Sequence, residues 1–127
     1  MEQQIKMVEE FHQKFKQTQS ALPAFLSDQE SKLRYDLGKE ELDEYMTAVE
    51  DKDLVEILDS LADQMYILIG TICKHGLQHR FNEAFDLVHK NNMMKLGLDG
   101  KPILRADGKI IKPEGFAKVE LKNILKF

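Results

Sequence analysis

The stretch EELDEYMTAVEDKDLVEILDSLADQMYILI, residues 40 to 69, decides the fold. Hydrophobic residues recur at three- and four-residue spacing on both sides of the short connection EDKD, which predicts two helices joined by a tight turn. Asp53 has the residue type of a helix N-cap, so the later helix is expected to start there and to continue through Ile72. Gly76 is a suitable residue to end it.

The first of these two helices is expected to span residues 28–49, and the same periodicity predicts two further helices, over residues 3–18 and 81–96. Ser27 and Glu30 have capping-box spacing, which favours a helix start near Asp28. The dipeptide Asp107-Gly108 lies between two short apolar runs and predicts a hairpin turn, whereas residues 113–127 are expected to be a loop with a short terminal helix. The expected fold is all-α: one domain, residues 1–127, forming an antiparallel bundle of about four helices with a short C-terminal β-hairpin or extended tail.

Composition and charge narrow the class of protein. The 127 residues are 43% hydrophobic, enough for one compact core. Residues 28–63 hold 13 acids against 4 bases, whereas residues 95–127 hold 8 bases against 4 acids. This pattern lacks the dominant basic surface that a nucleic-acid polymer requires. No apolar run approaches the roughly 20 residues that cross a membrane, and MEQQIKMVEE has no signal-peptide core, so we expect no membrane association and a cytoplasmic location. Cys73 is expected to be a small buried hydrophobe.

Several acids interrupt the apolar faces of the two central helices. On a helical wheel counted from Ser31, the apolar arc of the first runs from about 200° to about 320° and includes Leu33 and Ala48. Glu44 falls near 220° and Glu41 near 280°, inside that arc. On the second helix, three acids cluster within about 60° of one another, namely Glu56, Asp59 and Asp63. Antiparallel packing would bring the two groups together. The alternative is a pair of separate, solvated acidic faces.

Converging carboxylates need a means of relieving their repulsion. Two charges 4 Å apart repel by about 4 kcal/mol at an effective dielectric constant of 20. Protonation would require raised pKa values at several positions, whereas a hard divalent cation prefers oxygen ligands of this kind. We therefore expect Mg²⁺, or alternatively Mn²⁺, bound by oxygen atoms only, since no histidine joins the group. Such a site indicates phosphate chemistry.

The acidic pattern resembles a known family. EELDE followed by EILD is similar to the EExxE and ExxD signature of the all-α NTP pyrophosphohydrolases, the MazG-like superfamily that includes dimeric dUTPases and phosphoribosyl-ATP pyrophosphohydrolase. The segments VEEFHQKF, DSLADQMYILIGT and NNMMKLGLDGKPILRADGKIIKPEGF resemble the branch described as Cof-like. This resemblance implies Mg²⁺-dependent hydrolysis of an NTP or dNTP to NMP and pyrophosphate, by attack of a metal-activated water on the α-phosphorus. It also implies a homodimer or homotetramer.

The resemblance assigns roles to individual residues. Metal ligands are expected at Glu41, Glu44, Glu56 and Asp59, with Asp63 as an extra ligand or a residue that supports the ligands. Glu40 or Glu44 is expected to accept the proton of the attacking water. Substrate-binding residues are expected at Asn92 and Lys95. Tyr66, Arg105 and Lys112 are added as substrate-binding candidates because of their polarity and location, not because of the resemblance. The alternatives are a non-catalytic helical module that binds a nucleotide or a partner protein in a Mg²⁺-dependent way, and a purely structural bundle.

Overall fold

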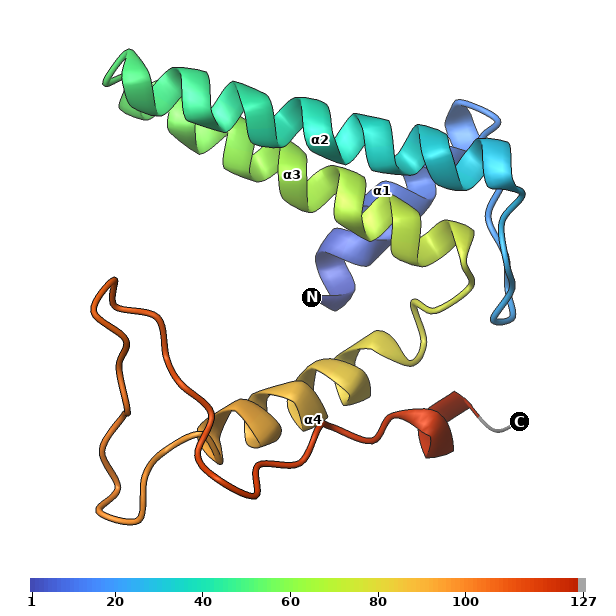
Figure 1. The fold of residues 1–127 in the computed structure, drawn as a ribbon. Coiled ribbons are helices and arrows are strands. Elements are labelled where there is room, and N and C mark those ends of the chain that lie inside the picture. The colour runs from blue at the N-terminus through green and yellow to red at the C-terminus, as the bar shows by residue number, and fades with distance from the viewer. Residues whose placement is uncertain (126–127) are drawn as a thin grey trace. The chain divides into compact units, whose positions relative to one another are not determined.

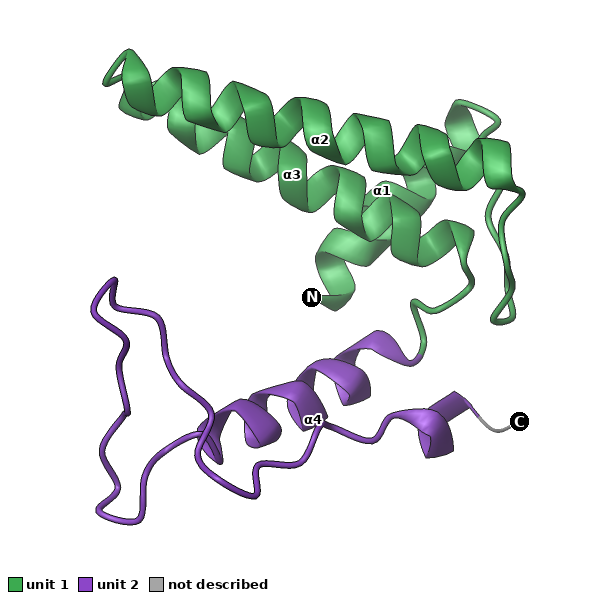
Figure 2. Cartoon of the chain, viewed as in Figure 1, with its two compact units in different colours: residues 1–79 green, residues 80–127 purple. Residues whose placement is uncertain are grey.

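The computed structural model describes residues 1–125 and is all-α, as predicted (Figure 1). The elements are α1 (Glu2–Lys14), α2 (Asp28–Glu50), α3 (Leu54–Lys74) and α4 (Phe81–Met93), followed by a short 3₁₀ helix η1 (Lys122–Leu125). Between residues 1 and 125 the only β-type pairing is an isolated bridge between Leu104 and Ile110. The chain divides into two compact units, residues 1–79 and residues 80–127, which are coloured separately in Figure 2.

In the first unit, α3 packs against both α1 and α2. Figure 1 shows α2 and α3 lying side by side, with α1 crossing α3. Ile5 and Val8 of α1 meet Ile69 and Cys73 of α3 in a small buried core. Cys73 is 0% exposed, which confirms its expected role as a buried hydrophobe. The long antiparallel α2–α3 pair is therefore the scaffold on which the acidic residues are arranged.

The predicted helix starts are confirmed by their caps. The Ser27 hydroxyl accepts a hydrogen bond from the Glu30 N–H at 3.1 Å. Asp53 Oδ1 accepts from the N–H groups of Val55 and Glu56, at 3.0 and 3.1 Å. The Glu30 carboxylate accepts from the Thr18 hydroxyl at 3.1 Å and so ties α2 to the preceding loop. These caps satisfy amides that a helix leaves free at its start.

Several predicted boundaries differ from the structure. Helix α1 ends at Lys14, not at residue 18, because Lys16 takes a left-handed conformation with φ 54°. Helix α4 ends at Met93, not near residue 96. Leu33, placed on the core-facing arc of α2 by its periodicity, is 54% exposed, whereas Ala48 on the same arc is buried. Within the first unit α2 packs closely on α3 alone, so residues at the edge of the arc stay in contact with solvent.

In the second unit, a long loop follows α4. The expected hairpin appears as a paired loop: the Arg105 N–H donates to the Lys109 carbonyl at 2.8 Å and the Ile111 N–H donates to the Ile103 carbonyl at 2.7 Å. Gly108 supplies the positive φ, 86°, that this turn requires. The pairing is too short to form strands, so the extended-tail alternative describes it better. The end of the expected terminal segment, residues 126–127, lies outside the described residues. None of the described helices combines the length and the apolar character needed to span a membrane.

Candidate metal and active site

An acidic groove of about 670 Å³ runs along the α2–α3 pair near their connection. It is lined by eight carboxylate side chains and one amine, that of Lys39, which donates to Asp43 at 3.1 Å. The remaining lining residues are Thr47, Ala48 and Ser60. The carboxylates belong to Asp36, Glu40, Asp43, Glu44, Asp51, Asp53, Glu56 and Asp59. With one base among eight acids, the groove has a negative electrostatic potential, which attracts cations.

Three carboxylates converge beside this groove. One oxygen atom from each of Glu41, Glu44 and Asp63 lies within 4.8 Å of the other two. Glu41 and Glu44 come from successive turns of the same α2 face, and Asp63 comes from the facing side of α3. Glu41 and Asp63 are half-buried and Glu44 is exposed, so the group is open to solvent on one side.

The environment of Glu41 disfavours its charge. Burial is the largest cause, followed by its proximity to the Glu44 carboxylate and by the charges of Asp63 and Glu40, and together they raise the pKa of Glu41 to about 7. The Oε2 atom of Glu41 is buried and has no hydrogen-bond partner. A buried carboxylate oxygen without a donor costs free energy, which a cation bound at the same point would offset.

The donor set fits a hard divalent cation. All three converging groups offer carboxylate oxygen, which is the ligand type that Mg²⁺ and Mn²⁺ prefer. The unsatisfied Oε2 of Glu41 and the mutual repulsion of the three groups are both relieved by a positive charge at their centre. Separations of up to 4.8 Å between oxygens are wider than the edge of an ideal octahedron around Mg²⁺, about 3 Å, and small side-chain rotations would close them.

The structure groups the predicted acidic residues in an unexpected way. Glu41 and Glu44, two of the four predicted ligands, lie in the converging group, and Asp63, expected as an extra ligand or a supporting residue, joins them. Glu56 and Asp59 line the groove toward the helix connection and are not part of that group. Glu40 also lines the groove and is exposed. The cause is helix register, because Asp63 is level with Glu41 while Asp59 and Glu56 are one and two turns away along α3.

Tyr66 has a packing contact in the structure. Its ring meets the Phe11 ring edge-on, with centroids 5.5 Å apart, and so joins α3 to α1. The sequence suggested a substrate-binding role for this tyrosine from its polarity and location. The aromatic contact with α1 provides a structural reason for an aromatic residue at this position.

The other predicted substrate-binding residues belong to the second unit. Lys95 and Lys112 both approach the Phe116 ring, with Nζ atoms 5.7 and 5.8 Å from its centroid. Arg105 forms an ion pair with Asp107. Asn92 is exposed, whereas its neighbour Asn91 donates to the Ala117 carbonyl at 2.9 Å and holds the tail segment on α4.

Sequence reasoning missed several residues at the site. Asp43, which falls outside the apolar arc of α2, is exposed, and it lines the acidic groove together with Asp36 and Asp51. Arg34, half-buried between α2 and α3 two turns before Glu41, had no sequence signal, because a lone arginine on a helix is most often a surface residue. Its importance follows only from the packing of α2 on α3.

Comparison with known proteins gives one family. The sequence profile of the family described as phosphoribosyl-ATP pyrophosphohydrolase matches residues 8–92, which include α2, α3 and all the acidic residues of the groove and of the converging group. A search among curated proteins gave no match.

Proposed function

Since the chain belongs to the phosphoribosyl-ATP pyrophosphohydrolase family, part of the MazG-like all-α superfamily, it is assigned to the nucleotide pyrophosphohydrolases, and we propose that its substrate is an NTP or dNTP. The observation that carries this proposal is the convergence of Glu41, Glu44 and Asp63 beside a groove of about 670 Å³. A groove of this size matches the pockets that hold small ligands such as a nucleotide. The matched residues 8–92 run through the boundary between the two units, which supports treating residues 1–127 as one catalytic domain.

Glu41, Glu44 and Asp63 would hold the divalent cation, Mg²⁺ or Mn²⁺, with Glu56 and Asp59 as further ligands toward the helix connection. When bound, the cation neutralises phosphate charge and lowers the pKa of a coordinated water. Glu41 supplies the least hydrated oxygen of the group, because its Oε2 is buried. Glu44, which is exposed, is the carboxylate that meets the substrate side of the groove.

The reaction is a displacement at the α-phosphorus. A bond forms between the water oxygen and the α-phosphorus, the bond from that phosphorus to the α–β bridging oxygen breaks, and pyrophosphate leaves with the electron pair. The proton of the water passes to a carboxylate in the groove. Glu40 and Glu44 are the candidates, and we favour Glu40 because it lines the groove without belonging to the converging group.

The second unit is proposed to bind the nucleotide. Asn92, Lys95, Arg105 and Lys112 are the residues concerned, and they lie in a region where bases outnumber acids by 8 to 4. Ammonium and guanidinium groups bind phosphate by charge and by hydrogen bonds. Lys95 and Lys112 make no ion pair within the described part of the chain, so both charges are available to a phosphate. The NNMMKLGLDGKP segment in the same unit supports the Cof-like branch, which we retain as part of the proposal.

The enzyme is further proposed to be a homodimer or homotetramer. Apolar side chains are exposed along both helices of the central pair, among them Leu42, Met46, Leu58 and Leu68. A second hollow of about 520 Å³ between α2 and α3 is lined largely by apolar residues of this kind. Association of copies would remove this surface from water. Light scattering on the purified protein tests the proposal, and a monomer at micromolar concentration would contradict it.

A second candidate substrate is phosphoribosyl-ATP. It is favoured by the description of the matching family, and its hydrolysis breaks the same type of phosphoanhydride bond. The acidic groove serves either substrate, since both carry a triphosphate group that a divalent cation would neutralise.

One assay separates these possibilities. The protein is incubated with Mg²⁺ and, in turn, with each common NTP and dNTP and with phosphoribosyl-ATP, and the products are resolved by ion-exchange chromatography. Pyrophosphate with the matching monophosphate supports the proposal, and release from phosphoribosyl-ATP alone supports the second candidate. Mg²⁺-dependent binding without pyrophosphate would favour a non-catalytic module.

The matched variants for this assay are Glu41→Gln and Glu50→Gln. Both remove one negative charge from α2, but Glu50 neither lines the groove nor joins the converging group. We expect Glu41→Gln to lose at least about tenfold in activity, the scale on which residues that support a metal act, and Glu50→Gln to retain it. Equal activity of the two variants would contradict the assignment of the site.

A further inference from the structure

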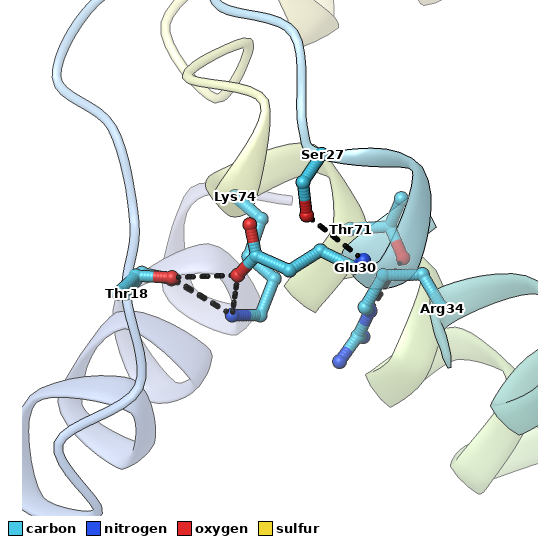
Figure 3. A network of polar contacts seen from close by, with 6 residues as sticks. All are labelled: Thr18, Ser27, Glu30, Arg34, Thr71 and Lys74. Carbon is cyan, nitrogen blue, oxygen red and sulfur yellow. Dashed lines mark hydrogen bonds and ion pairs between the residues drawn. The ribbon is translucent and has the colours of Figure 1, made fainter. Parts of the chain in front are cut away.

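Arg34 is an arginine held within the packing of the first unit. Its Nε donates to the Thr71 hydroxyl at 3.0 Å (Figure 3). Its Nη2 donates to the Ile67 carbonyl at 2.6 Å, and both acceptors lie on α3. No carboxylate of residues 1–125 forms an ion pair with it. Burial lowers the pKa of its guanidinium from the ordinary value. A half-buried cation without an acidic partner is costly, so its retention calls for a geometric explanation.

Space for Arg34 is created by a glycine on the facing helix. A Cβ atom added at Gly70 would lie 2.6 Å from Arg34 Nη2 and 3.1 Å from His12 Nε2. Gly70 is buried in the middle of α3, where glycine costs about 1 kcal/mol relative to alanine. The glycine and the arginine therefore fit one another, at a cost to each helix.

The pairing of Arg34 with Gly70 follows the same register of α2 on α3 as the converging carboxylates. One turn before Arg34 on α2, Glu30 faces Lys74, with 3.8 Å between the carboxylate and Nζ, and Lys74 also donates to the Thr18 hydroxyl at 3.2 Å (Figure 3). Two turns after Arg34 on α2, Glu41 faces Asp63. From each of these residue pairs to the next, the residue number on α2 rises by as much as the residue number on α3 falls. A single antiparallel register of the two helices requires this.

We propose that Arg34 is a positioning residue that fixes the register of α2 on α3 and thereby brings Glu41 and Glu44 onto Asp63. This inference rests on the metal site proposed above. A slip of one residue moves a helix by about 1.5 Å and turns its side chains by about 100°, which would separate the three oxygens. The two hydrogen bonds of Arg34 do not survive such a slip, because they reach one carbonyl and one hydroxyl on successive turns of α3.

The test measures Mn²⁺ binding and folding of the same purified, metal-free variants. Arg34→Met removes both hydrogen bonds, and Lys32→Met is the control, since it removes one positive charge two residues away on an exposed part of α2. We expect Arg34→Met to bind Mn²⁺ about tenfold more weakly by titration calorimetry and Lys32→Met to bind it like the wild type. Thermal unfolding is recorded in parallel, so that affinity is compared only among folded proteins.

Two further variants keep the proposal testable if Arg34→Met does not fold. Arg34→Lys keeps the charge and one donor and is expected to fall between the wild type and Arg34→Met in Mn²⁺ affinity. Gly70→Ala retains the Arg34 side chain, but the added methyl group would push its guanidinium away from α3, so a loss of Mn²⁺ affinity is expected here too.

The outcomes separate this inference from the proposed function. If the wild type binds Mn²⁺ and the folded Arg34 and Gly70 variants bind it equally well, Arg34 is a structural residue only and the inference is overturned while the proposed function stands. If the wild type binds no Mn²⁺, the metal site and the inference that rests on it both fall.

Discussion

Removal of the Asp63 carboxylate should make the metal-free protein more stable. One oxygen of Asp63 lies within 4.8 Å of an oxygen of both Glu41 and Glu44. Two unit charges at that distance repel by about 3.5 kcal/mol at an effective dielectric constant of 20 and by about 0.9 kcal/mol in water. Since the group is open to solvent on one side, a value near the lower limit applies, and Asp63→Asn is expected to raise the free energy of unfolding by about 1 kcal/mol at pH 8.

The effect should depend on pH because of Glu41, whose pKa in the metal-free protein is raised to about 7, mainly by burial. A pKa that is higher in the folded state than in the unfolded state gives stability that is complete below the ordinary value of 4.5 and is lost as the pH rises through 7. Asp63→Asn removes one of the charges that raise this pKa, so the loss on going from pH 5 to pH 8 should be smaller in the variant.

Urea unfolding in the presence of EDTA, at pH 5 and pH 8, measures both quantities, and Mn²⁺ titration of the same samples measures affinity. The control is Asp59→Asn, the same change one turn earlier on α3, at a residue that lines the groove outside the converging group. We expect Asp63→Asn to stabilise the metal-free protein and weaken Mn²⁺ binding, with smaller effects for Asp59→Asn. Loss of stability at pH 8 in Asp63→Asn, or a larger loss of Mn²⁺ affinity in Asp59→Asn, would refute the reasoning.

Two further predictions concern the scaffold. His12 is 3% exposed, and its pKa is lowered from the ordinary 6.5 by burial and then by the charges of Lys74 and Arg34, so its contribution to stability is lost as the pH falls below 6.5. His12→Asn should therefore reduce the fall in melting temperature between pH 7 and pH 5. An unchanged pH profile of the melting temperature would contradict this prediction. Gly76 has a φ of 67°, and a Cβ there would overlap the Leu22 carbonyl, so Gly76→Ala should lower the free energy of unfolding, measured in urea, by more than about 2 kcal/mol. Gly108 has a φ of 86° but open space around it, so Gly108→Ala should lower the same free energy by about 1 kcal/mol. Equal losses in the two variants would show that the Leu22 contact does not matter.

The parts of the fold that depend only on residues close together in the sequence were predictable from it. Ser27 and Asp53 cap α2 and α3 where their residue types indicated, and Gly76 follows the end of α3 with a positive φ. Each of these signals acts within a few residues, so no knowledge of the tertiary structure is needed to interpret it. The exposure of Leu33 was not predictable in this way, because it depends on how far a partner helix covers that face of α2. The early end of α1 was not predictable either, because no local signal indicates the left-handed conformation of Lys16.

The site was predictable only in part, for the same reason. The helical wheel placed Glu41 and Glu44 on the face of α2 that turns toward α3, and both lie in the converging group. It could not decide which acid of α3 meets them, since Glu56, Asp59 and Asp63 share one face and differ only in their level along the axis. That level is set by contacts between residues distant in sequence, such as Glu30 with Lys74 and Arg34 with Ile67.

The α2–α3 pair thus contains two opposing sets of interactions. Arg34 and Lys74 draw α2 onto the far end of α3, while the acids of the groove repel one another near the connection between the helices. A bundle under selection for stability alone would replace Glu41 and Asp63 with apolar residues, since both lie half-buried where the helices meet. Because local conflicts of this kind are expected at functional positions, their concentration on one stretch of α2 and α3 supports the proposed site over the alternative of two solvated acidic faces.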